Sequence, residues 1–414
     1  MLFISLLIAL VGVYLLQYFL YKKYAFHNVR YTVKTANTEV FENDEIYIYE
    51  EITNDKLLPL PFVKVDTELP EGLAFCITEK DSGTGRMVET YPRVIHSLFV
   101  LRSHEMVRRR WKIRCSTRGT YTLGNVTLLV NDILGTHLQS RIIVPEKTEM
   151  QANEQNSGNV LVVLPRAVSL VKEFTSSMYN SGDILVRRSL ISDPLYLAGV
   201  REYQNGDPMS RVNWLKTASQ QKLMVNIEEY TKRYAFNIVM NMQSRDMEKN
   251  IPGPPSMRPS VELCITVAAS ILDSVASDMI PVRVICNTPP EQFGEEFSAA
   301  VSDEDAAGQS VFVSPAYQGR SDIITALRML AQMELMISMP IERLLDHMVQ
   351  NPYAYTSGGN IIFVSSFLNE RMIQFCYAMR RQGITVVFYI TTTSSNAQFI
   401  PDDIEVHFKA YKEP

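Results

Sequence analysis

The sequence lacks the motifs of several common enzyme classes. It has no glycine-rich phosphate-binding loop and no Gly-x-Ser-x-Gly nucleophile turn. A Cys–His hydrolase that pairs Cys286 with His347 is one alternative, but Cys286 lies in an apolar run, where burial disfavours a thiolate. The histidines are far apart, and none belongs to a recognised metal or nucleophile motif: His27, His96, His104, His137, His347 and His407. We therefore predict a non-enzymatic protein without catalytic residues, resident metal or cofactor.

An excess of basic charge is also missing. The chain has 40 Lys and Arg against 45 Asp and Glu, which gives a net charge of -5 and argues against nucleic acid as a partner. Its 5 cysteines are odd in number, widely spaced and mostly placed in apolar runs: Cys76, Cys115, Cys264, Cys286 and Cys376. This pattern is typical of buried thiols in a reducing compartment, not of a disulfide framework or a zinc site.

The N-terminus carries one long apolar run, from Leu2 to Leu20. At about 1.5 Å per residue, a helix of this length crosses a hydrocarbon core of about 30 Å. A cleaved signal peptide would have a basic start, a shorter apolar stretch and a small-residue cleavage site, so we favour a single-pass transmembrane anchor over residues 1–24. Basic residues follow the run and none precedes it: Lys22, Lys23, Arg30 and Lys34. The positive-inside rule then predicts that the bulk of the chain is cytoplasmic.

Residues 28–147 show the alternation of half-buried strands. The clearest segments are 28–34, 45–49, 61–65, 94–100 and 106–113. Short strands at this spacing predict an antiparallel β-sandwich. The cluster Arg108–Arg110 suggests a phosphate or lipid-headgroup site, but a strand places at most two of the three on one face. We favour a solvated face.

Three motifs in this order carry a family resemblance. A strand with Arg118-Gly119-x-Tyr121-x-Leu123-Gly124 ends in an Asp-x-x-Gly turn at 132–135, Leu164-Pro165-Arg166 follows, and the stretch 201–216 comes last. Together with the run 181–188, they resemble the bacterial domain-of-unknown-function-58 family, from about residue 28 onward. Members of that family often start with two membrane helices, whereas this chain has one.

The remainder divides into three parts. Residues 148–159 are polar and predict a linker, and residues 160–222 form the family signature and junction segment. From 223 to 414, apolar strands alternate with helices, which predicts a doubly wound α/β domain. We predict strands at 223–227, 235–240, 282–285, 360–364 and 384–390, and helices at 261–279, 322–335 and 369–382.

The signature stretch holds the first candidate site. Asp207 followed by Pro208 predicts a helix that begins at Pro208, which would place Arg211 and Trp214 on one face. Two interpretations are equally weighted: a recognition site for a carboxylate, phosphate or partner peptide, or a structural clasp in which Arg201 or Arg211 pairs with Asp207 and Trp214 packs between domains. The candidate residues are Arg201, Tyr203, Gly206, Asp207, Arg211, Trp214 and Lys216.

The resemblance implies that residues 223–414 form a von Willebrand factor A-like domain. The hallmark of such domains is a Mg²⁺-dependent adhesion site that begins with Asp-x-Ser-x-Ser at the carboxyl ends of the strands. This chain has Asn241, Gln243 and Arg245 instead, and an arginine there would repel a divalent cation. We therefore expect a degenerate site without metal, at Asn241, Gln243, Arg245, Ser321, Asp322 and Ser366.

These features favour a membrane-anchored cytoplasmic scaffold that binds another protein. The family resemblance implies a MoxR-type AAA+ ATPase as partner, in the assembly or remodelling of an envelope complex. The alternative is a Mg²⁺-dependent adhesion module or enzyme that uses residual oxygens of Asn241, Ser244, Ser321 and Asp322.

Overall fold

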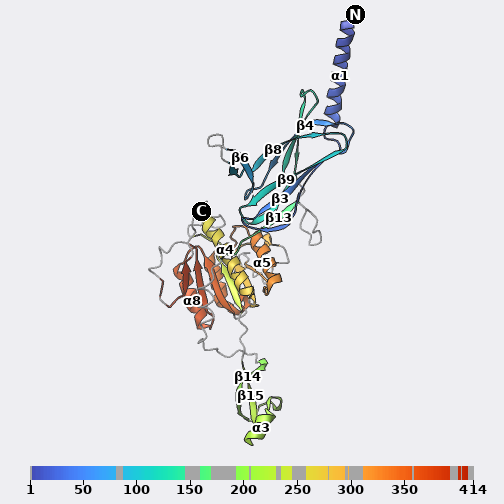
Figure 1. Ribbon diagram of the computed structural model, residues 1–414. Coiled ribbons are helices and arrows are strands. Elements are labelled where there is room, and N and C mark those ends of the chain that lie inside the picture. The colour runs from blue at the N-terminus through green and yellow to red at the C-terminus, as the bar shows by residue number, and fades with distance from the viewer. Residues whose placement is uncertain are drawn as a thin grey trace. The chain divides into compact units, whose positions relative to one another are not determined.

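The computed structural model contains two compact units (Figure 1). The first comprises Met1–Arg166 with Ile324–Glu334, and the second comprises Ala167–Ile323 with Leu335–Pro414. The structure describes residues 2–80, 87–144, 159–168, 193–204, 207–229, 235–244, 258–277, 279–293, 297, 311–356, 359–391, 400–401 and 403–408. Gly206, Arg245, the run 181–188 and all of the predicted linker except Asn159 lie outside these residues.

The first unit begins with an apolar helix, α1 (Leu2–Tyr24). Most of its side chains are exposed, and it is long and apolar enough to cross a membrane. The predicted N-terminal apolar helix is therefore confirmed. Residues 259–276 of α4 (Arg258–Ser277) pass the same test of length and composition, but 61% of that window is buried, as in a core helix.

Strands follow α1 and form a β-sandwich, because alternate side chains along them turn inward. In β8, for example, every second residue is buried. One sheet has the order β1-β3-β9-β5 and another β12-β11-β4-β8, with all neighbours antiparallel, while β13 pairs with both β10 and β2. The strands are β1 (Val29–Thr35), β2 (Glu39–Phe41), β3 (Glu45–Asn54), β4 (Leu60–Glu68), β5 (Leu73–Phe75), β6 (Ile77–Lys80), β7 (Met87–Thr90), β8 (Val94–Leu101), β9 (Glu105–Cys115), β10 (Gly119–Thr122), β11 (Val126–Asn131), β12 (Leu138–Ile143) and β13 (Val160–Leu164). The five segments predicted as strands are confirmed.

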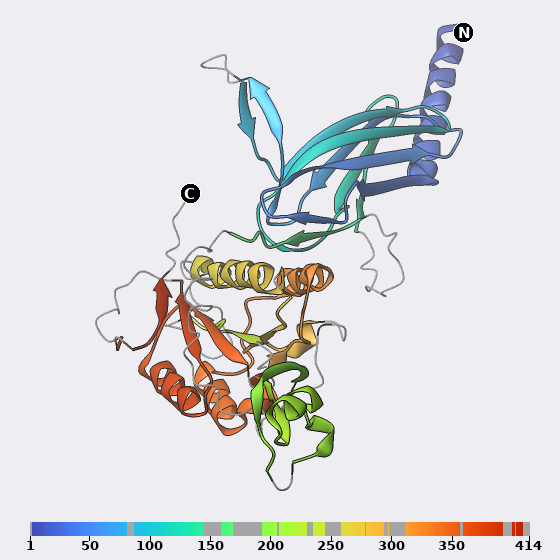
Figure 2. The ribbon, with the colours of Figure 1, turned by 60° about the horizontal axis from the view of Figure 1, so that its bottom comes forward.

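The second unit contains a mixed sheet of order β18-β17-β16-β19-β20-β21. All neighbours are parallel except β17 and β18. The sheet is buried on both faces, since α4 covers one and α6 with α8 covers the other (Figure 2). The strands are β16 (Phe236–Met240), β17 (Val282–Cys286), β18 (Phe312–Val313), β19 (Asn360–Ser365), β20 (Val386–Ile390) and β21 (Val406–Phe408); the remaining helices are η3 (Pro290–Gln292), α5 (Arg320–Gln332), α6 (Ile341–Gln350), α7 (Pro352–Thr356) and α8 (Glu370–Arg381). The predicted helices and strands of this sheet are confirmed.

The signature stretch belongs to a small module in the second unit. Its strands, β14 (Asp193–Glu202) and β15 (Met224–Glu229), pair antiparallel in a sheet of their own. The strand predicted at 223–227 is therefore confirmed, but it does not join the larger sheet. Between the two strands lie a 3-10 turn, η1 (Met209–Arg211), and a short helix, α3 (Trp214–Gln220).

The predicted helix start at Pro208 is wrong. Pro208 has an extended backbone, and α3 begins only at Trp214, where the Asn213 side chain accepts a hydrogen bond from the backbone N–H of Lys216. Asn213 is thus the N-cap that the sequence analysis assigned to Asp207. Arg211 and Trp214 consequently do not lie on the same helix.

Candidate functional site

Arg201 and Asp207 form a bidentate ion pair in the signature module. Arg201 Nη1 and Nη2 each donate to one carboxylate oxygen of Asp207 at 2.7 Å, and the backbone N–H of Gln204 donates to the same carboxylate at 2.9 Å. The Arg201 bond, then the Gln204 bond, lowers the pKa of Asp207 to about 2. The predicted pairing of Arg201 with Asp207 is confirmed. Both terminal nitrogens of the Arg201 guanidinium group bind this internal carboxylate, as in a structural clasp.

The titration of Asp207 is expected to report this clasp. Because the folded pKa is lowered, the contribution of the ion pair is complete above about pH 4 and is lost as the pH falls toward 2. Carboxyl ¹³C NMR should give a midpoint near 2 for Asp207, and a midpoint near the usual value after Arg201→Gln. A normal midpoint in the unchanged protein would contradict the pairing.

The apolar side chains of the module are exposed. Trp214 is 64% exposed and Leu215 83%, both in the first turn of α3, and Met209 beside them is 55% exposed. At 64% exposure, Trp214 is not buried within its own module, and its packing between domains stays an interpretation. Leu215 was not among the predicted residues, although an apolar residue next to a tryptophan is a sequence signal of such a surface.

Three other signature residues belong to the same module. Arg211 is exposed, and its charge contributes to the lowered pKa of Asp207. Lys216 is exposed and lies in the first turn of α3, while the backbone N–H of Tyr203 donates to Leu223 O at 2.9 Å, which holds the start of the stretch to the residue before β15. The module thus combines an internally paired arginine with exposed apolar and basic side chains.

The second candidate site lies where the strand order of the large sheet reverses, between β16 and β19. In open α/β sheets, the crevice at the carboxyl ends of such strands is the usual ligand position. Asn241 and Gln243 follow β16, Ser365 ends β19 and Ser366 follows it, so the structure brings together three of the predicted residues here: Asn241, Gln243 and Ser366.

Hydrogen bonds within the protein occupy the polar groups of this edge. The side chain of Asn241 donates through Nδ2 to Ser365 Oγ at 3.0 Å, and its Oδ1 accepts from Gln243 N at 3.0 Å and from Asn287 Nδ2 at 3.2 Å. Gln243 Oε1 accepts from Ile341 N at 3.1 Å, and Ser366 Oγ donates to the backbone oxygen of Gln243 at 3.2 Å. Asn241 and Asn287 are fully buried.

Ser321 and Asp322 lie at the opposite edge of the sheet. Asp322 accepts from Gln318 N at 3.0 Å, Gln318 Nε2 donates to Met279 O at 2.6 Å, and the neighbouring Tyr317 bridges to Val282, the first residue of β17. Asn241, by contrast, follows the last residue of β16. The grouping of Ser321 and Asp322 with Asn241 is therefore wrong, because β18 runs antiparallel and returns α5 to the amino ends of the strands.

The described residues at the carboxyl edge do not fit a Mg²⁺ ion. Mg²⁺ needs several oxygen ligands, usually including a carboxylate, but here both lone pairs of the Asn241 oxygen accept internal hydrogen bonds and its nitrogen faces Ser365. No group of three or more His, Cys, Asp or Glu side chains suited to a metal occurs in the described part of the chain.

The family-like motifs of the first unit meet at the loop between β2 and β3. The Glu42 carboxylate accepts from the backbone N–H of Arg118 at 2.9 Å and of Arg166 at 3.3 Å, and Arg166 also pairs with Asp44. The Arg118 side chain donates to Leu330 O at 2.8 Å and Met333 O at 2.7 Å, at the C-terminal end of α5. These arginines therefore hold backbone in place rather than presenting charge to a ligand.

The cluster Arg108–Arg110 behaves as the alternation predicts. The guanidinium groups of Arg108 and Arg110 lie over the rings of Tyr49 and Tyr47, and that of Arg109 lies over Phe99, which comes from the other sheet. No two neighbouring arginines share a face.

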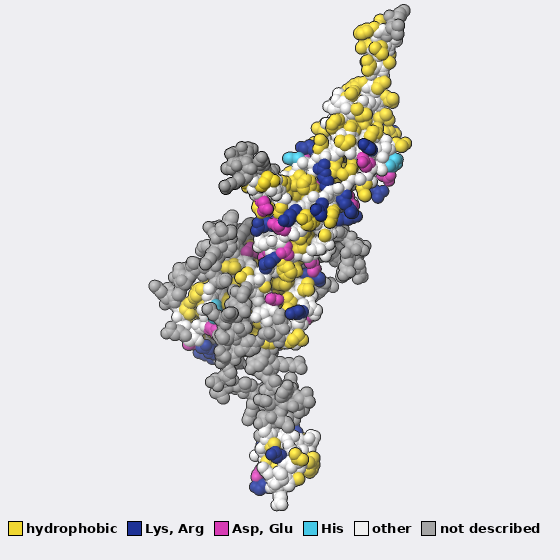
Figure 3. All heavy atoms as spheres, viewed as in Figure 1, with side chains coloured by type: hydrophobic (Ala, Val, Ile, Leu, Met, Phe, Trp, Pro, Cys, Tyr) yellow, Lys and Arg dark blue, Asp and Glu magenta, His cyan; other side chains and the backbone are white. Residues whose placement is uncertain are grey.

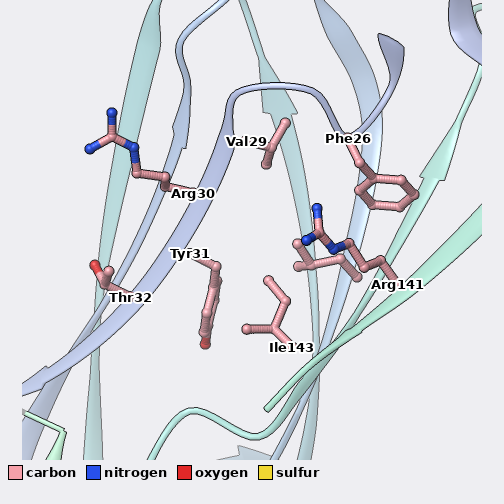
Figure 4. A pocket seen from close by; sticks show the side chains of 8 residues that line it. Phe26, Val29, Arg30, Tyr31, Thr32, Arg141 and Ile143 are labelled. Carbon is pink, nitrogen blue, oxygen red and sulfur yellow. The ribbon is translucent and has the colours of Figure 1, made fainter. Parts of the chain in front are cut away.

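One pocket of about 320 Å³ opens beside β1 in the sandwich (Figure 4). Its wall is apolar, and two guanidinium groups also line it; the residues are Phe26, Val29, Arg30, Tyr31, Thr32, Leu128, Arg141 and Ile143. This lining offers no carboxylate, thiol or histidine for catalysis. The pocket could not be predicted from the sequence pattern, because its residues come from four separate segments: β1, β11, β12 and the segment after α1.

Cys286, the other catalytic alternative, is fully buried in β17. Burial raises the pKa of its thiol to about 12, so that it remains protonated and poorly nucleophilic at neutral pH.

No family model matches this chain, and no curated protein matches it either. The chain is similar to solved structures over about a third of its length. They include the CARDB domain of a Pyrococcus furiosus protein (13% identity, 34% of this chain and 94% of that chain, TM-score 0.18), the native alpha-2-macroglobulin of Escherichia coli (10%, 33% and 23%, 0.21) and a non-cellulosomal cohesin of Archaeoglobus fulgidus (13%, 28% and 94%, 0.19). These TM-scores are too low to carry an argument about function.

Proposed function

We propose that this chain is a membrane-anchored scaffold that binds another protein through the exposed face of α3. The observation that carries the proposal is the exposure of Trp214 and Leu215 on a module whose neighbouring Arg201 and Asp207 are paired with each other. Tryptophan and arginine dominate binding energy at protein interfaces, and adjacent exposed apolar side chains are costly unless a partner covers them.

The family resemblance supplies the broader setting of this proposal. We propose membership of the domain-of-unknown-function-58 family and a von Willebrand factor A-like second unit, supported by the reversal of strand order beside Asn241. In this setting α1 is the anchor, Lys22 and Lys23 keep the bulk of the chain in the cytoplasm, and the partner is a MoxR-type AAA+ ATPase that acts on an envelope complex. Among the described residues, no group of side chains favours the Mg²⁺-dependent alternative.

Direct binding tests the proposal. The full chain in nanodiscs should bind a purified MoxR-type ATPase from the same organism, and Trp214→Ala should raise the dissociation constant at least tenfold, because buried interface tryptophans typically contribute about 2 kcal/mol or more. Leu215→Ala should act in the same direction.

The matched control is Tyr353→Ala, which removes a 73% exposed aromatic side chain from α7 and should leave binding unchanged. Equal affinity of the unchanged protein and Trp214→Ala would contradict this site, and absence of binding would contradict this partner.

A further inference from the structure

A turn of the sandwich is fixed to the side of α1. Asp132, only 1% exposed, accepts from Gln17 Nε2 of α1 at 3.1 Å, and the rings of Tyr18 and His137 are 5.0 Å apart. Thr136 donates twice to the same carboxylate, from N at 2.6 Å and from Oγ1 at 2.7 Å. These bonds hold the turn 132–136 at the level of Gln17 and Tyr18.

Electrostatics agree with a tightly held carboxylate. Burial by itself would raise the pKa of Asp132, but hydrogen bonds from Thr136, His137 and Gln17 outweigh burial and lower it. The charged form is thus satisfied inside the protein, which allows the turn to leave bulk water without an unpaired charge.

The length of the apolar run places the turn 132–136, which lies beside Gln17 and Tyr18, in contact with lipid. The run from Leu2 to Leu20 is about 28 Å long as a helix, barely the thickness of a hydrocarbon core, so that a bilayer needs all of it. Gln17 and Tyr18 lie inside this run and also contact the sandwich. A bilayer that covers the run therefore reaches the turn.

The tip of the turn has the side chains that such a position requires. Ile133 is 53% exposed and Leu134 is 60% exposed. Both lie between Asp132 and His137, the two residues that contact α1. Figure 3 shows hydrophobic side chains covering α1 and continuing onto the adjoining end of the sandwich. In water these two side chains have no cover, whereas in the interfacial layer of a membrane they gain burial.

We propose that the turn 132–136 is embedded in the interface of the bilayer that α1 crosses, with Ile133 and Leu134 among the lipids, so that the sandwich is fixed to the membrane surface rather than tethered to it. This inference rests on the proposed role of α1 as an anchor. It adds a second, non-helical contact with lipid and defines one end of the sandwich as the membrane-facing end.

A depth measurement tests the proposal on the full chain in phosphatidylcholine–phosphatidylglycerol vesicles. Four of the cysteines are buried, so that in a Cys76→Ser background a nitrobenzoxadiazole label reacts at an introduced cysteine. The labelled variants are Leu134→Cys and, as a second probe of the same turn, Ile133→Cys. Leu57→Cys is the matched control, since Leu57 is 82% exposed but lies beside Lys56, which donates to Ala25 O and His27 O beyond the end of α1.

Quenching by doxyl-labelled phosphatidylcholine should be at least twofold stronger at positions 133 and 134 than at position 57, with emission shifted to shorter wavelength. Retention of the chain in vesicles after alkaline carbonate treatment separates the two proposals. A retained chain with equal quenching at all three positions overturns the embedded turn and leaves the anchor standing. Loss of the chain from the vesicles overturns both.

Discussion

Replacing Glu50 by alanine is expected to lower the free energy of unfolding of the sandwich by about 3–5 kcal/mol. Glu50 is 1% exposed, and its carboxylate accepts from Tyr31 Oη at 2.8 Å, Thr67 Oγ1 at 3.1 Å and Trp111 Nε1 at 3.0 Å. Burial first, and then the Glu50 charge, raises the pKa of Tyr31 far above its usual range, so that Tyr31 remains a donor. Alanine would leave three donors inside the sandwich without their acceptor.

Urea denaturation of the full chain in mild detergent measures this effect, because the emission of Trp111 reports on the same cluster. Glu50→Gln should lower the free energy of unfolding less than Glu50→Ala does. The amide oxygen of glutamine can still accept a hydrogen bond, whereas its NH₂ group faces one of the donors. Glu45→Ala on the same strand, which removes an exposed carboxylate paired with Lys112, should cost less than about 1 kcal/mol. A loss no larger for Glu50→Ala than for Glu45→Ala would refute the role of this cluster.

Asn241→Asp is expected to destabilise the second unit by about 3–4 kcal/mol at pH 7 and by much less at pH 4. The substitution restores the first residue of the Asp-x-Ser-x-Ser pattern, but it places a carboxyl group at a position that is 0% exposed, beside amides and a hydroxyl rather than a cation. Burial should raise the folded pKa by about two to three units, and each unit corresponds to about 1.4 kcal/mol. A raised folded pKa means that the stability is present below the unfolded pKa and is lost as the pH rises through the folded value.

The same variant separates the degenerate site from a working metal site. If Mg²⁺ bound here, millimolar Mg²⁺ would recover the stability of Asn241→Asp at pH 7; we expect no recovery, since the described neighbours contribute no carboxylate and Asp322 lies at the other edge. Asn351→Asp is the control for the change of charge, because Asn351 is exposed and directly precedes the first turn of α7, a position that accepts aspartate as well as asparagine. Recovery by Mg²⁺ would revive the adhesion-module alternative.

Local pattern determined most of the secondary structure. The strands β1, β3, β4, β8 and β9 follow from alternation, and α1 follows from an uninterrupted apolar run, because burial on one face leaves a period in the sequence itself. The exposed α3 surface was predicted only in part. The sequence indicated Trp214, but the helix that contains it begins at Trp214 and not at Pro208.

The two errors have different physical causes. Asp207 had the sequence context of an N-cap, but its carboxylate pairs with Arg201 and accepts from the backbone N–H of Gln204 instead, within one local turn. Asp322 had the context of a metal ligand, yet the antiparallel direction of β18 returned it to the wrong edge. The second outcome depended on strand direction, which no single segment encodes.

The sequence by itself determined that this chain has an apolar N-terminal helix, a β-sandwich and a sheet with helices, because those features depend on which side chains avoid water. Only the tertiary structure decided which polar groups meet when they lie far apart in the sequence. Gln17 donates to Asp132, and Asn241 donates to Ser365, although more than a hundred residues separate the partners of each pair. Strand order and register, rather than distance along the chain, determine the partners of such hydrogen bonds.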